Sequence, residues 1–384
     1  MSQASLEGGA AQGPGAPQRM SLRDRWRRFR NARLGDARFQ RWAAGFPFTR
    51  PVALKSARAL FDLTAGFVYS QILYSCVKLG VFEALADEPL TLDALARRIG
   101  LERDAAERLL RAAASLRLAE RCDDGRWTLG DLGAAMLGAA GVREMVEHHA
   151  ALYADLADPV ALLKNRGGRI GDYWAYSRNA AAGALTPEKV ADYSALMAAS
   201  QATFLEDVVA AAPLRGRRRL LDVGGGEGRF VCAAAKAAPG LELAVFDLPA
   251  VAERAEARFA QDGVPARAHG GDFFNDALPE GYDLISLIRV CFDHDDAPAL
   301  RLLGAVRKAT PAGGAVMVAE TMAGTPGAEP VGDAYFGFYL LAMGSGRPRT
   351  AAELTALLRA AGFGAVREAR TARPMLARVL VATP

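Results

Sequence analysis

The chain has 384 residues, 51% of them apolar and 23% charged, which is enough to fill and cover the cores of about two globular domains. Its formal net charge is only +4, so overall charge gives no argument for binding nucleic acid. The cysteines (76, 122, 232, 291) and the histidines (148, 149, 269, 294) are too scattered for a zinc cage or a disulfide framework. We therefore expect reduced thiols, no metal site and a cytoplasmic protein.

The N-terminal region combines a small-residue tail with a basic, aromatic segment. Residues 1–18 are rich in Gly, Ala, Pro and Gln and predict a disordered tail. Residues 19–58, called the arm below, carry twelve Lys or Arg and two Asp, with Trp26, Phe29, Phe39, Trp42, Phe46 and Phe48 between them. Such a segment suits an anionic membrane surface, or else packs its aromatic side chains on its own protein or a dimer mate. No signal pattern precedes it, and no apolar run approaches the ~20 residues that span a bilayer.

Residues 59–212 predict a mainly helical domain with a winged-helix pattern. Gln71 to Leu85 is apolar nearly all round, which is typical of a buried helix, often in a subunit interface. Thr91 can cap the next helix, a further helix follows to Leu116, and residues 123–127 predict a hairpin turn. The helix over 102–117 mixes four arginines with three acidic residues, a poor face for phosphate contacts. We therefore expect dimerisation and no nucleic acid.

Residues 213–384 predict an α/β domain. Strands are expected at 219–223, 243–246, 266–269, 282–288 and 315–318, with helices at 230–238, 249–260 and 297–309 between them. Strands that alternate with helices imply a parallel sheet covered on both faces. A helix over 350–361 and strands near 365–370 and 377–382 would add an antiparallel edge.

A glycine-rich loop follows the first of these strands. The run Asp222-Val223-Gly224-Gly225-Gly226-Glu227-Gly228 leads from a strand into a helix and lets backbone N–H groups approach a ligand. Its spacing alone is compatible with NAD. Asp222, however, repels pyrophosphate and suits the ammonium group of an amino-acid-bearing cofactor such as S-adenosylmethionine.

Two more acids stand at the ends of the next strands. Asp247 lies 21 residues beyond Gly226, where an acid binds ribose hydroxyls. Asp272 follows the third strand and could reach the adenine amino group, with Phe273 stacked on the base. Each acid alone could equally be a helix cap or turn residue, but three at successive strand ends favour a methyl-donor site.

These residues resemble the plant-type O-methyltransferases with a helical dimerisation domain, from about residue 60 to the C-terminus. Within that family, the arm, residues 192–197 and residues 289–296 look closest to the bacterial carotenoid hydroxyl O-methyltransferases. The resemblance implies a Rossmann-like S-adenosylmethionine-binding sheet preceded by a winged-helix dimerisation domain, in a homodimer. It implies cofactor binding by Asp222, Gly224, Gly225, Gly226, Gly228, Asp247, Leu248, Asp272, Phe273 and Arg289.

The chain differs from its family at the residues that would remove the proton of the acceptor. The family's general base, the histidine of a His-Asp-Trp triplet, is replaced in Phe292-Asp293-His294, and Pro348 replaces a second acid. Glu320 keeps its acidic position, so the catalytic candidates are His294, Asp293 and Glu320. Either His294 takes the proton, or positioning suffices and the proton leaves late. His294 could equally cap a helix or pack on the cofactor.

The acceptor itself is less readable. Apolar residues of a predicted helix over 333–343, with Tyr193 and Met197, could line a tunnel for a hydrophobic small molecule, although that helix could equally pack in the dimer. The leading expectation is methylation of the tertiary 1-hydroxyl of an acyclic carotenoid, at the inner face of the membrane. The alternatives are another apolar acceptor (a bacteriochlorophyll precursor or an aromatic polyketide), a cofactor-binding homologue without transfer activity, and a winged-helix regulator.

Overall fold

The structure, a computed structural model, describes residues 20–139, 141–173 and 204–384. The chain divides into two compact units, Met1–Gln71 and Ile72–Pro384. Tyr193 and Met197, which were expected to line the acceptor tunnel, lie outside the described residues.

From residue 20 onward, the first unit consists of helices that expose most of their large apolar side chains. It contains α1 (Leu22–Leu34), α2 (Ala37–Gly45) and the first part of α3 (Arg50–Lys78). Ser21 caps α1 by accepting the N–H of Asp24, and Asp36 caps α2 by accepting two N–H groups. α1 buries none of its residues.

Helix α3 is long and apolar enough to cross a membrane, judged by its length and composition alone. The expectation of no uninterrupted apolar run of this length still holds, because Lys55, Arg58 and Asp62 divide α3 into a mixed first part and an apolar second part. The core helices of water-soluble proteins satisfy the same measure, so the finding is weak evidence for a span.

The second unit begins with the predicted winged-helix arrangement. The end of α3, α4 (Val81–Ala84), α5 (Leu92–Arg98) and α6 (Arg103–Ser115) share one apolar core with the hairpin of β1 (Ala119–Arg121) and β2 (Trp127–Leu129). Thr91 caps α5 as predicted, and accepts the N–H of Ala94 at 3.3 Å. The single helix expected over residues 71–85 is instead two, because Gly80 adopts a left-handed φ of 67° between α3 and α4.

Arginines of α6 and of the turn that follows it lie beside carboxylates. Arg103 pairs with Asp93 at 2.9 Å, Arg111 pairs with Glu107 at 2.7 Å, and Arg117 binds Asp131 of α7 (Asp131–Gly138). Internal pairing of this kind weakens the contact that arginines can make with a phosphate backbone. Three further helices, α8 (Val142–Asp155), α9 (Pro159–Asn165) and α10 (Arg169–Tyr173), complete the helical region before residue 174.

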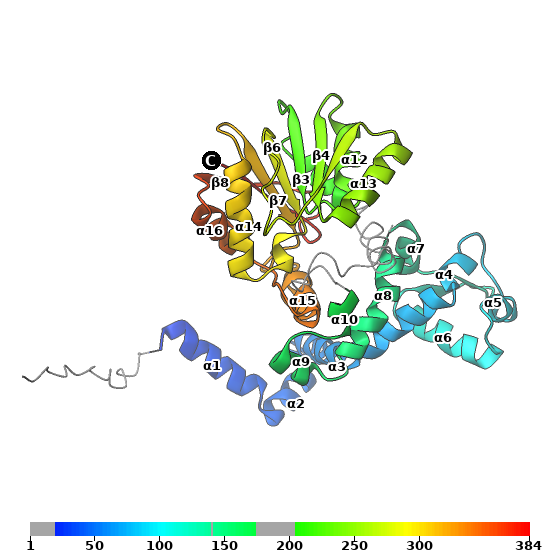
Figure 1. The fold of residues 1–384 in the computed structure, drawn as a ribbon. Helices are drawn as coiled ribbons and strands as arrows, with labels where there is room; N and C mark the ends of the chain where they lie inside the picture. The colour runs from blue at the N-terminus through cyan, green and yellow to red at the C-terminus, as the bar shows by residue number, and fades with distance from the viewer. Residues whose placement is uncertain (1–19, 140, 174–203) are drawn as a thin grey trace, which may run out of the picture. The chain divides into compact units, whose positions relative to one another are not determined.

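The α/β domain contains a sheet of seven strands with the order β5-β4-β3-β6-β7-β9-β8 (Figure 1). Five strands are parallel, and β9 joins β7 antiparallel, which confirms the predicted edge. The strands are β3 (Arg219–Val223), β4 (Glu242–Asp247), β5 (Ala266–Gly270), β6 (Leu284–Ile288), β7 (Ala315–Glu320), β8 (Ala365–Ala369) and β9 (Arg378–Thr383).

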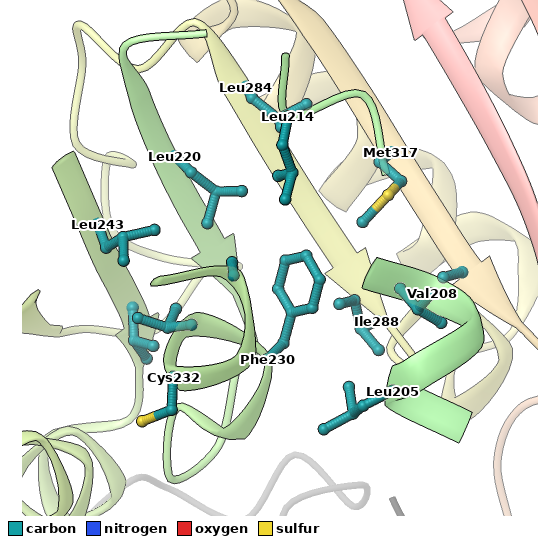
Figure 2. Close-up of a cluster of buried hydrophobic side chains, with 14 of the residues drawn as sticks. Leu205, Val208, Leu214, Leu220, Phe230, Cys232, Leu243, Leu284, Ile288 and Met317 are labelled. Atoms are coloured by element: carbon teal, nitrogen blue, oxygen red, sulfur yellow. The ribbon is translucent and has the colours of Figure 1, made fainter. Parts of the chain in front are cut away.

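Helices cover both faces of this sheet, as the alternating pattern predicted. Successive residues point to opposite faces, so Leu220 belongs to one buried cluster and Leu221 to the other. On the first face, Phe230 of α12 (Arg229–Ala237) and Val208 from a helix over 204–211 point at the strands (Figure 2). The other cluster includes residues of α14 (Asp296–Ala309) and α16 (Ala351–Ala360).

Two elements near the parallel strands' carboxyl ends complete the fold. Pro249 begins α13 (Pro249–Asp262), which follows β4. The helix expected over 333–343 is present, but its first part, η2 (Pro330–Phe336), is π-helical, and only α15 (Gly337–Met343) is α-helical. Short π-helical stretches often occur at functional sites.

Candidate functional site

Asp222 lies at the carboxyl end of β3 and is buried. Its Oδ1 accepts a hydrogen bond of 2.6 Å from Ser286 Oγ of the neighbouring strand β6. Burial, assisted by the negative charge of Asp247, raises the pKa of Asp222 to about 7, even though the hydrogen bond from Ser286 acts in the opposite direction. A cation would therefore be favoured beside this carboxylate. Sequence reasoning missed Ser286, whose only signal is one hydroxyl inside an otherwise apolar strand.

The glycine loop is closely packed on one side and open on the other. A Cβ at Gly225 would lie 2.5 Å from Asp222 Oδ2, and one at Gly228 would lie 2.4 Å from the ring of Phe259. Gly224 and Gly226 both adopt left-handed φ angles, and a Cβ at Gly226 would meet nothing within 4 Å. The loop thus presents backbone to open space, which fits the close approach of a cofactor.

Asp247, at the end of β4, shapes this loop. Its Oδ2 accepts the N–H of Gly226 at 2.8 Å, and its Oδ1 accepts the N–H of Leu248 at 2.7 Å. Burial raises the pKa of Asp247 to about 6, while the two N–H groups lower it. Each oxygen keeps a further lone pair, so the carboxylate can also accept ribose hydroxyls.

Glu227, which sequence reasoning assigned no role, fastens the loop to α13. Its Oε1 accepts Arg254 Nε at 2.9 Å and its Oε2 accepts Arg258 Nη2 at 3.2 Å. Its side chain is almost fully buried, so these charge-assisted bonds compensate its desolvation. A signal was present, because arginines four residues apart share one helix face.

Asp272 follows β5 and orders a turn, which was the alternative to a role in cofactor binding. Its Oδ1 accepts the N–H of Phe274 at 2.9 Å, and its Oδ2 accepts Asn275 Nδ2 at 2.6 Å. The carboxylate is therefore already engaged in ordering its own loop. The turn also places the rings of Phe273 and Phe274 with their centroids 4.7 Å apart.

His294 lies against these two rings. Its ring contacts Phe273 edge-on at 5.7 Å and Phe274 at 5.1 Å. Burial, together with the positive charge of Arg349, lowers the pKa of His294 to about 4. The imidazole is thus neutral at neutral pH, and it is a weak base.

The two acidic catalytic candidates lie after β6 and at the end of β7. Glu320 Oε2 accepts the N–H of Phe292 at 3.1 Å. Glu320 Oε1 and Asp293 Oδ1 are buried and have no hydrogen-bond partner among the residues that the structure describes. Burial raises the pKa of Glu320 to about 7 and that of Asp293 well above its ordinary value. Unsatisfied buried oxygens of this kind are costly and mark a site for a ligand or proton.

Arg289 adopts a left-handed φ of 56°, a conformation that is rare outside glycine, and its N–H donates to the carbonyl of Ala319 at 2.8 Å. Its guanidinium lies 5.8 Å from the ring of Phe204 and 6.0 Å from that of Phe292. Its positive charge lowers the pKa of Asp293, against the larger effect of burial. Arg289 therefore lies within electrostatic reach of Asp293.

A fully buried arginine, also missed in the sequence, holds the loop after β6. Arg349 donates to the carbonyls of Cys291 at 2.8 Å and His294 at 2.7 Å, and to Asp296 Oδ1 at 2.8 Å. Gly346 packs against the same loop so closely that a Cβ there would lie 2.2 Å from the carbonyl oxygen of Phe292. The backbone around Phe292 is therefore fixed from two sides.

Phe292 is buried in an apolar wall that is built from residues of both the helical region and the α/β domain. The cluster joins it to residues of α8, α9, α10 and α15: Leu152, Leu162, Ile170, Tyr339, Leu340, Ala342 and Met343. The predicted lining residues Tyr339, Leu340 and Met343 are thus brought together with Phe292. Among the described residues, no group of three or more His, Cys, Asp or Glu is placed to hold a metal ion.

Two family profiles match the chain. Residues 61–139 match the profile described as an O-methyltransferase dimerisation domain, and residues 153–364 match that of an O-methyltransferase domain. The chain is 44% identical to demethylspheroidene O-methyltransferase of Cereibacter sphaeroides, with 91% of this chain and 92% of the relative covered. It is 40% identical to the same-named protein of Rhodobacter capsulatus, over 88% of this chain and 84% of that one.

Solved structures agree with these matches. CalO1, a methyltransferase in calicheamicin biosynthesis solved with S-adenosylhomocysteine bound, is 26% identical and has a TM-score of 0.72, covering 86% of this chain and 98% of its own. Human N-acetylserotonin methyltransferase, solved with S-adenosylmethionine, shares the fold with a TM-score of 0.69 at 24% identity, covering 85% of this chain and 97% of its own.

Proposed function

Because the chain belongs to the family of S-adenosylmethionine-dependent O-methyltransferases with a dimerisation domain, we propose that it methylates the tertiary 1-hydroxyl of an acyclic carotenoid. The observation that carries this proposal is the 44% identity to demethylspheroidene O-methyltransferase over nine-tenths of both chains. The apolar wall around Phe292 supports it, because a wall of this composition suits a hydrocarbon chain rather than a polar acceptor.

We assign the cofactor to the carboxyl ends of β3, β4 and β5. Asp222 would pair with the ammonium group, Asp247 would accept the ribose hydroxyls, and the rings of Phe273 and His294 would pack on the base. S-adenosylmethionine supplies an electrophilic methyl group on a sulfonium sulfur. Arg289 was expected among the cofactor ligands, but its place beside Phe292 and Asp293 favours a role on the acceptor side.

The acceptor's proton is assigned to the two buried carboxyls. A tertiary alcohol is a very weak acid, so its proton leaves during or after methyl transfer and needs an acceptor at that moment. Asp293 Oδ1 and Glu320 Oε1 are buried oxygens that the described residues leave unsatisfied. Asp293 follows Phe292 in the chain and Glu320 accepts its N–H, and Phe292 occupies the position of the family's histidine base.

His294 is better placed to pack on the cofactor than to act as a base. We expect His294→Ala to raise the Kd for S-adenosylmethionine about tenfold, because one aromatic contact of about 1 kcal/mol or slightly more is lost. His294→Phe, which keeps the ring without its nitrogens, should restore both affinity and turnover. Titration calorimetry and single-turnover rates measure the two quantities. A His294→Phe variant that binds cofactor normally yet has lost transfer would contradict this assignment.

The proposed activity is tested with the purified full chain, labelled cofactor and three acceptor classes in detergent or vesicles: 1-hydroxylated acyclic carotenoids such as hydroxyneurosporene and demethylspheroidene, a bacteriochlorophyll precursor, and an aromatic polyketide. We expect a methyl ether of the carotenoid and one S-adenosylhomocysteine per ether formed. Transfer only to the bacteriochlorin or the polyketide would overturn the proposal. Tight cofactor binding without S-adenosylhomocysteine on any acceptor would indicate a non-transferring homologue.

We also propose that the arm, residues 19–58, holds the enzyme on the inner face of the cytoplasmic membrane. Within α1 and α2 the side chains of Trp26, Phe29 and Trp42 are more than half exposed, and Phe48 is 86% exposed. Arginines are interspersed among these rings, and Arg33 lies over the ring of Phe29 at 5.4 Å. Exposed aromatics and arginines together suit the boundary between anionic headgroups and acyl chains, where a carotenoid would be supplied.

Vesicle flotation tests the arm. The full chain is expected to float with anionic phosphatidylglycerol vesicles at low salt and to dissociate as salt is raised. The triple change Trp26→Ser, Phe29→Ser and Trp42→Ser should weaken binding by at least about 1,000-fold, since each buried ring contributes roughly 1.5–3 kcal/mol. Leu132→Ser, an equally polarising change at an exposed residue of α7, is the control. A triple variant that floats normally but changes its oligomeric state would show that the arm binds a dimer mate instead.

A further inference from the structure

Two adjacent histidines of α8 hydrogen-bond two tyrosines that stand one turn apart. His149 Nε2 lies 2.8 Å from the hydroxyl oxygen of Tyr335 in η2, and His148 Nε2 lies 2.9 Å from that of Tyr339 in α15. These contacts join residues that are 186 and 191 positions apart in the sequence. They connect the helical region to the wall of the proposed acceptor site.

The two tyrosines differ in their surroundings. Tyr339 is 4% exposed and belongs to the apolar cluster around Phe292. Tyr335 is only half-buried and is packed against that cluster from outside. Its hydroxyl also lies 3.6 Å from the sulfur of Met145, so its closest polar contact is His149.

A series of ring contacts links Tyr335 to Phe292, whose backbone binds one of the acidic candidates. The ring of Tyr335 contacts Phe336 edge-on at 5.0 Å, and Phe336 contacts Phe292 at 5.8 Å. The N–H of Phe292 in turn binds Glu320. The positive charge of Arg289, which also acts on Asp293, lowers the pKa of Tyr335, although burial raises that pKa overall. The Tyr335 hydroxyl thus remains protonated and lies within the electrostatic reach of Arg289.

We propose that Tyr335, held by His149, is the polar contact that orients the acceptor hydroxyl of an otherwise apolar alcohol. Resting on the proposed function, this inference names the group that selects the alcohol end of the substrate. Before methyl transfer, the tyrosine O–H donates to the neutral imidazole of His149, and its oxygen accepts the hydrogen of the acceptor hydroxyl. Because the hydrogen of the acceptor hydroxyl points at Tyr335, a lone pair of the acceptor oxygen is directed away from the wall and is available for methyl transfer. Once the methyl group has moved to the acceptor oxygen, that proton leaves for the carboxylate of Asp293 or Glu320.

The same contact separates substrate from product. The alcohol can donate a hydrogen bond to Tyr335, whereas the methyl ether has no hydrogen to donate. A site that is built to accept this bond therefore binds the ether less tightly than the alcohol. A purely structural role for the tyrosine would not produce that difference.

The test compares Tyr335→Phe with the matched control Tyr339→Phe, each losing one hydroxyl from a histidine–tyrosine pair. In the full chain, Tyr335→Phe should lower kcat/KM for the hydroxylated carotenoid about tenfold, the effect of one neutral hydrogen bond. In the wild type, the inhibition constant of the methyl ether should exceed the dissociation constant of the alcohol. In Tyr335→Phe the two constants should become similar. Tyr339→Phe should leave the ratio of these constants unchanged, and neither variant should alter the Kd for S-adenosylmethionine.

His149 is tested with a conservative and a disruptive change. His149→Gln keeps a hydrogen-bonding group for the Tyr335 hydroxyl and should retain most of the selectivity, whereas His149→Leu should resemble Tyr335→Phe. Equal ratios in Tyr335→Phe and wild type, with cofactor affinity intact, would overturn the inference. If the wild-type enzyme itself fails to methylate the carotenoid alcohol, the proposed function fails instead, so the two results are distinguishable.

Discussion

Replacing Asp247 by alanine is expected to weaken S-adenosylmethionine binding by at least about 100-fold, measured by titration calorimetry. The carboxylate accepts the N–H groups of Gly226 and Leu248, so its loss disturbs the loop that presents backbone to the cofactor. It also removes the acceptor that we assign to the ribose hydroxyls. Hydrogen bonds to a charged group contribute about 1.5–3 kcal/mol each, so losing two corresponds to roughly two to four powers of ten.

The control for Asp247→Ala is Glu256→Gln, which removes one negative charge from the exposed side of α13. It should bind cofactor as the wild type does, which separates local hydrogen bonding from the general loss of charge. Thermal unfolding of both variants without cofactor checks that the sheet is intact. An Asp247→Ala protein with unchanged affinity and a normal unfolding curve would refute the ribose assignment.

The second large effect is expected at the buried carboxyls. Glu320→Gln should lower kcat about 100-fold or more, the range that a positioned proton acceptor contributes, while the Kd for cofactor stays unchanged. Gln can still accept the N–H of Phe292, so the loop should keep its shape. Asp293→Asn is the companion variant, and Glu280→Gln on the exposed surface is the matched control.

The pH profile gives an independent measurement of the same assignment. Burial raises the pKa of Glu320 to about 7, and a carboxyl accepts a proton only when it is ionised. The rate of the wild type should therefore fall as pH falls through about 7 and reach a plateau above it. Glu320→Gln should flatten this dependence. A profile that is identical in wild type and Glu320→Gln would assign the proton elsewhere.

The α/β domain could be predicted from the sequence because its signals are local. Each buried strand is a short apolar run between turn residues, and parallel strands end at the same edge of the sheet. Asp222 and Asp247 could be placed together on that basis. The break at Gly80 and the π-helical turn at 330–336 could not, since they change the backbone without interrupting the apolar pattern.

The contacts that shape the acceptor side could not be predicted for a different reason. Arg349 binds the loop at 291–296, and His149 meets Tyr335 across 186 residues of sequence, so no spacing rule connects these partners. His294 illustrates the same limit. As a lone histidine it was compatible with a base or a packing residue, and its ring contacts with Phe273 and Phe274 favour packing.

The buried guanidinium of Arg349 has a consequence for the entropy of substrate binding. By holding the carbonyls of Cys291 and His294, it orders the loop around Phe292 when the protein folds rather than when a ligand arrives. A long acceptor loses translational and rotational freedom, and the conformational freedom of its saturated ends, when it binds. If the loop around Phe292 were disordered before binding, binding would have to order the loop and the acceptor together. With the loop already rigid, only the acceptor must be ordered, so a weakly polar molecule can still bind productively.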